Sequence, residues 1–513
     1  MGATTADSRS SLGAGPSYDD EARTRLFDDY DSLGGDSALE NQRTPHAPKV
    51  TPVPKAELAT LCAVRIVDPI AFTQIFPYVN EMMEHLHLTN DPSRIGFYSG
   101  IVESSFALAQ VVSIYQWAKL SDSIGRRPVV LLGMFGIGLG TLFMGMSTSL
   151  FGVIFARCLG GFFSGNVAVV HSVLGEITDS TNQAIAFPIY GLCWPLGAII
   201  GPLIGGLLSN PATKYARWFD NDLFRQYPYL LPCIAASAIA FAGTLFGFFY
   251  LKETLPSRHF KSKEDTPLDE YHGSGTFGAP VEPISMRYLL KIPLVRALCL
   301  SGAGLSFITT GFDVSFVLFC YTPLAQGGLS FDAQKIGYAL SISGLVSILL
   351  QIAVMPFVLR RFDHAWTYNA CMALWPFCFV LLPALNVLAR AGAADLAAGT
   401  LTEHGRAVVW LAVSGVMVIS RTAALAFSVS MILVKEAAPS PSSLGVTNGI
   451  TQFAMCLSRS FSPAFASSLM AFSMGYDHIL LKYLWVLIMS LIAFFCTTLS
   501  RRIAEGRRPH PPR

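Results

Sequence analysis

The sequence predicts an all-α polytopic membrane protein with twelve transmembrane helices in two six-helix halves. Of the 513 residues, 52% are hydrophobic and 14% are charged, and the mean hydropathy is +0.47. Soluble domains carry roughly 25% charged residues. The apolar residues form blocks of about twenty, the length of a helix that spans roughly 30 Å of hydrocarbon. A polar central segment separates these blocks into two groups of six.

The chain divides into five segments. Residues 1–55 contain nine acidic and six basic side chains and little apolar surface, so we expect a disordered cytoplasmic tail. The first half, 56–252, has six expected spans, at approximately 57–83, 95–118, 128–147, 150–175, 184–208 and 229–251. A cytoplasmic central loop is expected at 253–288. The second half, 289–500, has spans at approximately 289–322, 334–359, 365–389, 405–434, 443–474 and 479–499, before a cytoplasmic tail at 501–513.

Lysine and arginine counts in the loops set the expected orientation. With a cytoplasmic N-terminus, the inner loops and the C-terminal tail carry 17 basic residues, against eight on the outer side. The positive-inside rule therefore predicts that both termini are cytoplasmic, as an even number of spans requires. We expect a multi-pass monomer in the lipid bilayer of the plasma membrane or the vacuole.

Several function classes are excluded by composition and motifs. A net charge of +2 gives no nucleic-acid footprint. The ten cysteines lie in apolar runs without a CxxC motif, and His and acidic residues form no tight ligand cluster, so we expect no metal site. The sequence contains no GxxxxGK[ST] phosphate loop, which would indicate ATP use, and no nucleophile elbow, which would indicate an enzyme. We expect no cofactor.

Charged residues within the spans are the candidate functional residues. Each costs about 2.5–3.5 kcal/mol on insertion scales and therefore normally faces the bundle interior with a partner. The candidates for proton coupling or substrate binding are Asp68, Arg65, Glu103, Arg157 and Asp313. Arg65 and Asp68 are three residues apart and can pair on one helix face. The alternative is that such pairs only fix helix packing.

Two further patterns concern the fourth and fifth spans. Arg157 and His171 are fourteen residues apart, which on a continuous helix predicts a polar stripe along one face. The fifth span is rich in small residues, which let helices approach closely and bend. The candidates for helix packing or gating are Gly197, Gly201, Pro202 and Gly205.

The loop between the second and third spans reads WAKLSDSIGRRP over residues 117–128. Its charges, Asp122, Arg126 and Arg127, can pair across the two halves, and Gly125 permits a sharp reversal of the chain.

This loop closely resembles the cytoplasmic signature of the major facilitator superfamily, and departs from it at Ala118, where glycine is usual. Two further segments resemble motifs of that family. Arg157 with Gly160 and Gly161 resembles the fourth-helix basic motif, and GAIIGPLIGG at 197–206 resembles the fifth-helix motif associated with proton-coupled antiporters.

The first span narrows the resemblance. Asp68 followed by Pro77 resembles the first-helix pattern of the twelve-span drug/proton antiporter branch, which includes tetracycline-type exporters. Residues 65–78 and 164–166 resemble fungal members similar to the zinc-induced-facilitator-like group. The second half retains a faint equivalent of the loop signature at 360–363.

The resemblance implies a secondary carrier in which two halves rock about a site near the midplane. We expect proton-coupled antiport of a small organic molecule or drug. In such a carrier we expect Asp68, with Glu103, to exchange a proton and Arg157 to transmit the protonation state. The resemblance also implies that the loop forms a cytoplasmic gate, made of Asp122, Gly125, Arg126 and Arg127. One alternative is a facilitator or symporter for a sugar, metabolite or metal chelate. Another, of a different class, is a non-transporting membrane receptor or sensor.

Aromatic side chains within the spans can line a substrate pocket; the alternative is that they lie in the core or face lipid. The candidates are Phe72, Tyr190, Trp194, Phe312 and Phe316.

Overall fold

The computed structural model describes residues 51–89, 94–179, 182–254, 286–395, 400–439, 444–476 and 478–505. Its helices belong to the compact unit Pro52–Arg513. Residues 1–50 of the expected N-terminal tail, 255–285 of the expected central loop and 506–513 of the expected C-terminal tail lie outside the described residues.

The described part of the chain before the central loop is helical. Its elements are α2 (Lys55–Arg65), α3 (Val67–Thr73), α4 (Val79–His85), α5 (Ile95–Ile124), α6 (Arg126–Gly145), α7 (Leu150–Ser164), α8 (Val167–Ile177), α9 (Gln183–Gly191), α10 (Cys193–Leu208), α11 (Pro211–Lys214), α12 (Ala216–Phe219), α13 (Asp222–Gln226) and α14 (Leu230–Tyr250).

The part after the central loop adds helices and a short antiparallel hairpin, in which Ala393 pairs with Leu401. Its elements are α15 (Met286–Lys291), α16 (Pro293–Tyr321), η2 (Leu324–Gln326), α17 (Ala333–Leu349), the π-helical η3 (Leu350–Val354), α18 (Met355–Arg361), α19 (His364–Ala373), α20 (Trp375–Ala391), β1 (Ala393–Asp395), β2 (Thr400–Leu401), α21 (Glu403–Ala424), α22 (Ala426–Ala437), α23 (Leu444–Met474), α24 (Ile479–Lys482) and α25 (Leu484–Glu505).

The expected all-α membrane fold is confirmed. Ten helical segments of the described residues are long and apolar enough to cross a membrane, and they correspond to the second to tenth and the twelfth expected spans. The first expected span is built from α2, α3 and α4, each too short to span alone. The eleventh is α23, a 31-residue helix whose hydropathy is lowered by its serines and by Arg459.

Several spans that the sequence suggests as continuous are interrupted, often near a proline. A proline has no N–H for the carbonyl four residues earlier. Pro376, near the start of α20, therefore gives the Met372 carbonyl no backbone N–H donor. The Thr497 hydroxyl of α25 donates to this carbonyl instead, at 3.0 Å. The fourth span is interrupted at Gly165 and Asn166, between α7 and α8.

The predicted polar stripe on the fourth span would run across this junction between α7 and α8, and it stays a prediction. Arg157 on α7 is buried with its guanidinium carbon 4.5 Å from the centre of the Phe106 ring, whereas His171 on α8 packs against Tyr190 with ring centres 5.4 Å apart. The two side chains thus have different neighbours.

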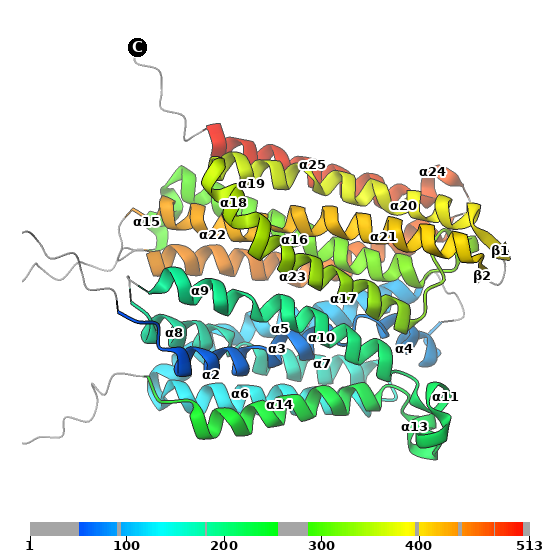
Figure 1. Ribbon diagram of the computed structural model, residues 1–513, viewed down its shortest axis with the longest axis horizontal. Helices are drawn as coiled ribbons and strands as arrows, with labels where there is room; N and C mark the ends of the chain where they lie inside the picture. Colours follow the sequence, from blue (N-terminus) through cyan, green and yellow to red (C-terminus); the bar gives the residue numbers. More distant parts are fainter. Residues whose placement is uncertain are drawn as a thin grey trace, which may run out of the picture. The chain divides into compact units, whose positions relative to one another are not determined.

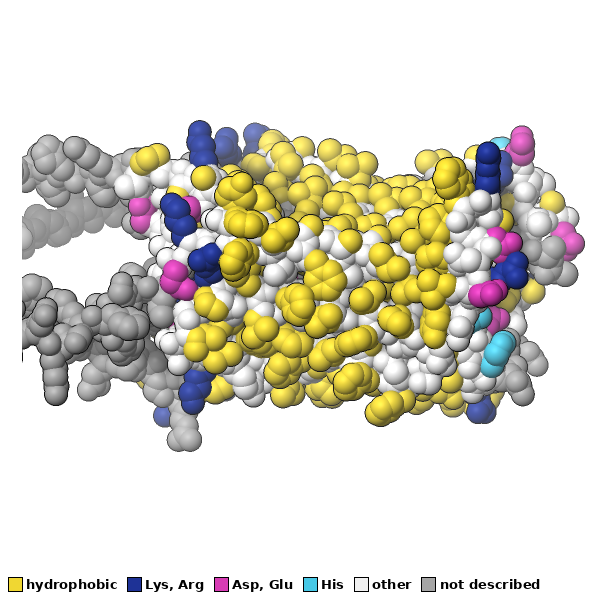
Figure 2. Space-filling view, turned by 90° about the horizontal axis from the view of Figure 1, so that it is seen from below, with side chains coloured by type: hydrophobic (Ala, Val, Ile, Leu, Met, Phe, Trp, Pro, Cys, Tyr) yellow, Lys and Arg dark blue, Asp and Glu magenta, His cyan; other side chains and the backbone are white. Residues whose placement is uncertain are grey.

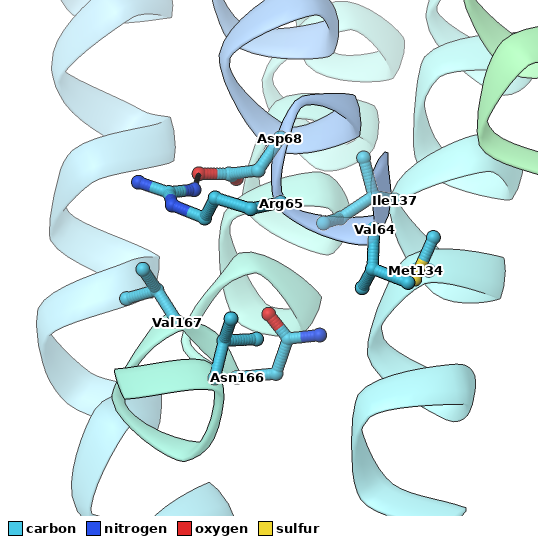
Figure 3. Close-up of a pocket in the computed structure, with 8 residues that line it drawn as sticks. Val64, Arg65, Asp68, Met134, Ile137, Asn166 and Val167 are labelled. Carbon is cyan, nitrogen blue, oxygen red and sulfur yellow. Dashed lines mark hydrogen bonds and ion pairs between the residues drawn. The ribbon is translucent and has the colours of Figure 1, made fainter. Parts of the chain in front are cut away.

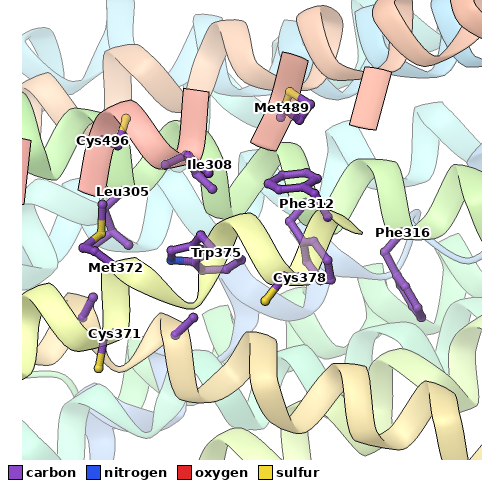
Figure 4. Close-up of a cluster of buried hydrophobic side chains, with 14 of the residues drawn as sticks. Leu305, Ile308, Phe312, Phe316, Cys371, Met372, Trp375, Cys378, Met489 and Cys496 are labelled. Atoms are coloured by element: carbon purple, nitrogen blue, oxygen red, sulfur yellow. The ribbon is translucent and has the colours of Figure 1, made fainter. Parts of the chain in front are cut away.

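The apolar cores of the two groups of helices are largely separate. The largest cluster of buried side chains comes entirely from residues 289–503 and includes Phe379. Phe312 and Trp375 also belong to it (Figure 4). The Phe312 ring packs edge-on against the other two, with ring centres 5.8 and 5.6 Å away. The two smaller clusters come from residues 58–251, apart from Ala333.

The long helices run alongside one another (Figure 1). We call the end that carries the α5–α6 turn the motif end; the start of α2 and the end of α25 also lie there. We call the opposite end, with α11–α13 and β1–β2, the hairpin end. Figure 2 shows an apolar belt between charged side chains at the two ends, as expected for a membrane-embedded surface.

Two pairs of helices join the groups. α5 packs on α23, and α10 packs on α17. Close approach depends on glycines: a Cβ at Gly100 of α5 would lie 2.8 Å from the Pro463 carbonyl oxygen, and one at Gly206 of α10 would lie 2.7 Å from the Ala333 carbonyl oxygen. The Ser104 hydroxyl of α5 accepts the Ala464 N–H of α23 at 2.9 Å.

Candidate functional site

Arg65 and Asp68 form an ion pair where the first span is interrupted. Arg65 is the last residue of α2 and Asp68 lies in the first turn of α3, and Arg65 Nη1 donates to Asp68 Oδ2 at 2.7 Å (Figure 3). The two side chains are 10% and 12% exposed. A cavity of about 10 Å³, enough for roughly one water molecule, adjoins them.

A chain of hydrogen bonds connects Asp68 to the other group of helices. The Ser164 hydroxyl of α7 donates to Asp68 Oδ1, and it accepts a hydrogen bond from Gln110 Nε2 of α5 at 2.8 Å. Gln110 Oε1 in turn accepts from Arg459 Nη2 of α23 at 2.7 Å. Both oxygens of Asp68 are therefore occupied, and the buried carboxylate is linked across the α5–α23 contact.

Gln110 was not predicted from the sequence as a candidate residue. Ser164 was noted only within residues 164–166, which carry the family resemblance. The signal for Gln110 is a polar side chain in the middle of an apolar 30-residue helix, where it requires a partner. Its partners are far away in the sequence, so the chain of hydrogen bonds could not be predicted.

Glu103 and Arg157 lie on neighbouring helices, α5 and α7, and are 4% and 3% exposed. Their charges interact, yet Glu103 Oε2 and Arg157 Nε and Nη2 have no hydrogen-bond partner among the described residues. The Arg157 guanidinium carbon instead lies 4.5 Å from the centre of the Phe106 ring and 5.7 Å from that of Phe72. Donors and an acceptor are thus buried close to aromatic faces.

Asp313 is placed differently from the other candidates. It lies on α16 of the second group of helices and accepts a hydrogen bond from Arg421 Nη2 of α21. Its side chain is 32% exposed. Among the candidate aromatics, Phe312 and Phe316 belong to the buried core of this group, while Phe72 and Trp194 lie near the arginines.

The small residues of α10 pack against the backbone of α3, the helix that carries Asp68. A Cβ at Gly197 would lie 2.6 Å from the side chain of Pro69, and one at Gly205 would overlap the Gln74 carbonyl oxygen. At Gly201 the nearest atom is the Thr73 hydroxyl. The opposite side of α10 faces α17, where a Cβ at Gly337 would lie 2.6 Å from the Pro202 carbonyl oxygen.

The predicted gate residues come together at the α5–α6 turn. Gly125 has φ +103°, a conformation that favours glycine. Asp122 accepts from Arg126 Nη1 at 2.6 Å. Arg127 Nη2 donates to a backbone carbonyl near the end of α14. Glu253, which the sequence did not indicate, accepts the N–H groups of Arg126 and Arg127 at 2.8 and 3.2 Å, so a carboxylate caps the N-terminus of α6.

The expectation that these charges pair across the two groups of helices does not hold in this structure. Arg126 Nε donates to Glu176 of α8 at 3.1 Å, and Glu253 follows α14, so these partners belong to the first group. The physical reason is that the α10–α17 contacts between groups extend from the hairpin end toward the middle of the helices. Nearby, the hydrogen bond from Lys252 to Glu57, 2.8 Å long, raises the pKa of the lysine.

Comparison with known proteins decides the family. The model of the Major Facilitator Superfamily matches residues 61–463. The chain belongs to the Major Facilitator Superfamily. It is 36% identical to the Major facilitator-type transporter psiT2 of Psilocybe cyanescens, over 93% of this chain and 96% of that protein. It is also 28% identical to the Major facilitator superfamily multidrug transporter mfsB of Aspergillus fumigatus, over 80% of this chain and 77% of that protein.

The narrower resemblance is confirmed as well. Protein ZINC INDUCED FACILITATOR 1 of Arabidopsis thaliana is 26% identical over 82% of this chain and 85% of its own length. The class H tetracycline resistance protein of Pasteurella multocida is 26% identical over 64% and 76%. Among solved structures, a bacterial homologue of the lysosomal transporter Spinster, inward-facing and unoccupied, matches with a TM-score of 0.61 and 15% identity, over 90% of this chain and all of that one. The chain is therefore a multi-pass membrane transporter with drug-efflux relatives.

Proposed function

We propose that the protein is a proton-coupled antiporter that moves a small organic molecule or drug out of the cytoplasm or into a vacuole. Residues 56–252 and 289–500 are the two halves, and they rock about a site between them. Relatives named as a multidrug transporter and a tetracycline resistance protein support the substrate class. The protein works as a monomer in the lipid bilayer.

The observation that carries this proposal is the chain of hydrogen bonds from Asp68 through Ser164 and Gln110 to Arg459. A proton on Asp68 removes negative charge that Arg65 now neutralises, and it takes away an acceptor that holds Ser164 in place. The hydrogen bond at the far end of the chain, between Gln110 and Arg459, joins the two halves. Proton binding in one half is thereby coupled to the contact between halves.

Glu103 and Arg157 supply a second exchangeable site. Each is buried and each has an unpaired polar atom, so a small rotation can bring the two side chains into contact. We assign to Glu103 a second proton position and to Arg157 the transmission of its protonation state. We assign a coupling role in the second half to Asp313 of α16, which is paired with Arg421 of α21.

We assign the gate to the motif end. The excess of lysines and arginines in the loops on the expected inner side supports a cytoplasmic location of this end and of both termini. Here Asp122, Arg126 and Arg127 are held by partners in their own half. When this end closes, we expect these charges to contact the other half. The close packing of Gly197, Gly201, Pro202 and Gly205 lets α10 carry movements of α3 to α17.

Asp68→Asn tests the proposal. A growth screen of a drug-sensitive yeast that expresses the protein, with a panel of toxic compounds that includes tetracycline, first identifies an exported compound. Uptake of that compound is then measured in inside-out vesicles with and without a pH gradient. We expect wild-type protein to accumulate it when the gradient is imposed and Asp68→Asn to lose this response while remaining in the membrane.

Asp220→Asn is the matched control, because Asp220 is an exposed acid paired with Arg225 between α12 and α13, away from the site. Gradient-driven uptake by Asp68→Asn at the wild-type rate would remove Asp68 from the coupling role. Uptake that is independent of the gradient in the wild type would indicate a facilitator. Absence of any transport with folded protein would favour a receptor or sensor.

A further inference from the structure

Three arginines and three aromatic rings converge between the halves, and we call them the arginine–aromatic cluster. The rings of Phe72 and Phe106 lie 5.1 Å apart between centres, and those of Phe72 and Trp194 lie 5.9 Å apart. The members are Arg65 of α2, Phe72 of α3, Phe106 of α5, Arg157 of α7, Trp194 of α10 and Arg459 of α23.

Arg459 connects the second half to this cluster. Its guanidinium carbon is 5.9 Å from the ring centres of both Phe72 and Trp194. Trp194 is 36% exposed and Phe72 is half-buried, so part of their aromatic surface is accessible. A planar aromatic group of a substrate can stack on this surface.

The hydrogen-bonding groups of the cluster are unequally used. Asp68 already accepts on both oxygens. Arg157 is only 3% exposed, and its Nε and Nη2 atoms have no acceptor among the described residues; Arg459 Nε also has none. Glu103 Oε2, one turn before Phe106 on α5, has no donor. Buried polar atoms of this kind normally have partners.

These unpaired atoms have complementary requirements. The unpaired N–H groups of Arg157 suit an acid group such as a carboxylate or phosphate, which guanidinium binds through parallel hydrogen bonds. The unpaired oxygen of Glu103 suits a protonated amine. A purely cationic substrate would pair with Glu103, but its charge would lie beside the like charge of Arg157. A purely anionic substrate would pair with Arg157, but its charge would lie beside the like charge of Glu103.

We propose that the arginine–aromatic cluster, together with Glu103, binds a zwitterionic aromatic molecule, with its acid group on Arg157, its amine on Glu103 and its ring among Phe72, Phe106 and Trp194. This rests on the proposed transport function and names its substrate class. The amine binds ionised Glu103, so substrate and proton compete for one carboxylate, as antiport requires. Asp68 stays paired with Arg65 and does not contact the substrate.

Binding of three matched naphthyl compounds to the purified full-length protein tests this assignment. The zwitterion is 3-(2-naphthyl)-L-alanine, the cation is 2-(2-naphthyl)ethylamine and the anion is 3-(2-naphthyl)propionate. Isothermal titration calorimetry in detergent at constant pH gives the three dissociation constants. We expect the zwitterion to bind at least tenfold more tightly than either singly charged compound.

Two variants assign the charged contacts. Arg157→Gln should abolish the preference for the zwitterion over the amine, and Glu103→Gln should abolish its preference over the propionate. Arg296→Gln is the control, because Arg296 is an exposed arginine in the first turn of α16. Thermal unfolding of each variant shows whether it is folded, and Arg157→Lys retains the charge if Arg157→Gln is unstable.

Three outcomes would overturn the proposal: the amine binding as tightly as the zwitterion in the wild type, none of the three compounds binding to folded wild-type protein, or affinity ratios that Arg157→Gln and Glu103→Gln leave unchanged. The binding measurement uses no proton gradient. Failure of the substrate assignment is thereby distinguished from failure of proton coupling, which the vesicle experiment with Asp68→Asn reports.

Discussion

Gln110→Leu should weaken the contact between the two halves. Gln110 is 5% exposed, and its side chain bridges Ser164 of its own half and Arg459 of the other. Leucine fills a similar volume without polar atoms, so the substitution removes the bridge and leaves little empty space. The side chain of Arg459 then loses its hydrogen bond to the other half.

The expected size follows from the geometry. The bond from Arg459 Nη2 to Gln110 Oε1 is 2.7 Å long and has a charged donor. Such a bond contributes about 1.5–3 kcal/mol, and this corresponds to a factor of about 10 to 100 in an equilibrium constant. Because the bond joins the halves, the substitution should raise by that factor the population in which α5 and α23 separate.

Hydrogen–deuterium exchange of the protein in lipid nanodiscs measures this opening. Peptides from the hairpin end of α5, where Gly100 and Ser104 contact α23, should exchange about 10 to 100 times faster in Gln110→Leu than in the wild type. Thr141→Val is the matched control, because this buried hydroxyl of α6 donates only within its own helix, to Ile137. Equal exchange in Gln110→Leu and Thr141→Val would refute the reasoning.

Two further substitutions test the packing. Gly205→Ala places a Cβ against the Gln74 carbonyl and should lower the free energy of unfolding by about 1–3 kcal/mol. Gly415→Ala is the control, because no atom of a neighbouring element lies within 4 Å of the added Cβ, and it should leave this free energy unchanged. Equal thermal unfolding of the two variants would contradict the tight α3–α10 contact. Glu253→Ala removes the carboxylate that caps α6 and should cost about 1 kcal/mol in the same assay; an unchanged unfolding temperature would show that the cap contributes nothing.

The all-α fold and most span positions were accessible from the sequence, because hydrophobic length reports directly on membrane crossing. The Arg65–Asp68 pair was also accessible, because residues three apart on a helix are neighbours. The interruptions were not predicted: Ile66 between α2 and α3 has helical backbone angles, and Pro69, which has no N–H for the Arg65 carbonyl, lies three residues after it. The junction between α7 and α8, which lies between Arg157 and His171, was likewise not predicted.

Contacts between distant segments account for what the sequence missed. Gln110 and Arg459 are 349 residues apart, and Glu253 caps a helix that begins 127 residues earlier. Neither pairing has a local pattern, because helix packing brings the side chains together. Asp122, Arg126 and Arg127 lie together at one turn, but two of their partners, Glu176 and Glu253, come from distant parts of the chain.

Proton movement in proteoliposomes tests the central claim most directly. The full-length protein is reconstituted with a pH-sensitive dye inside acidic vesicles, and the compound identified by the growth screen is added outside. Proton-coupled antiport predicts that wild-type protein alkalinises the interior in step with uptake of the compound, and that Asp68→Asn does not. Uptake by the wild type without any change in internal pH would contradict the account.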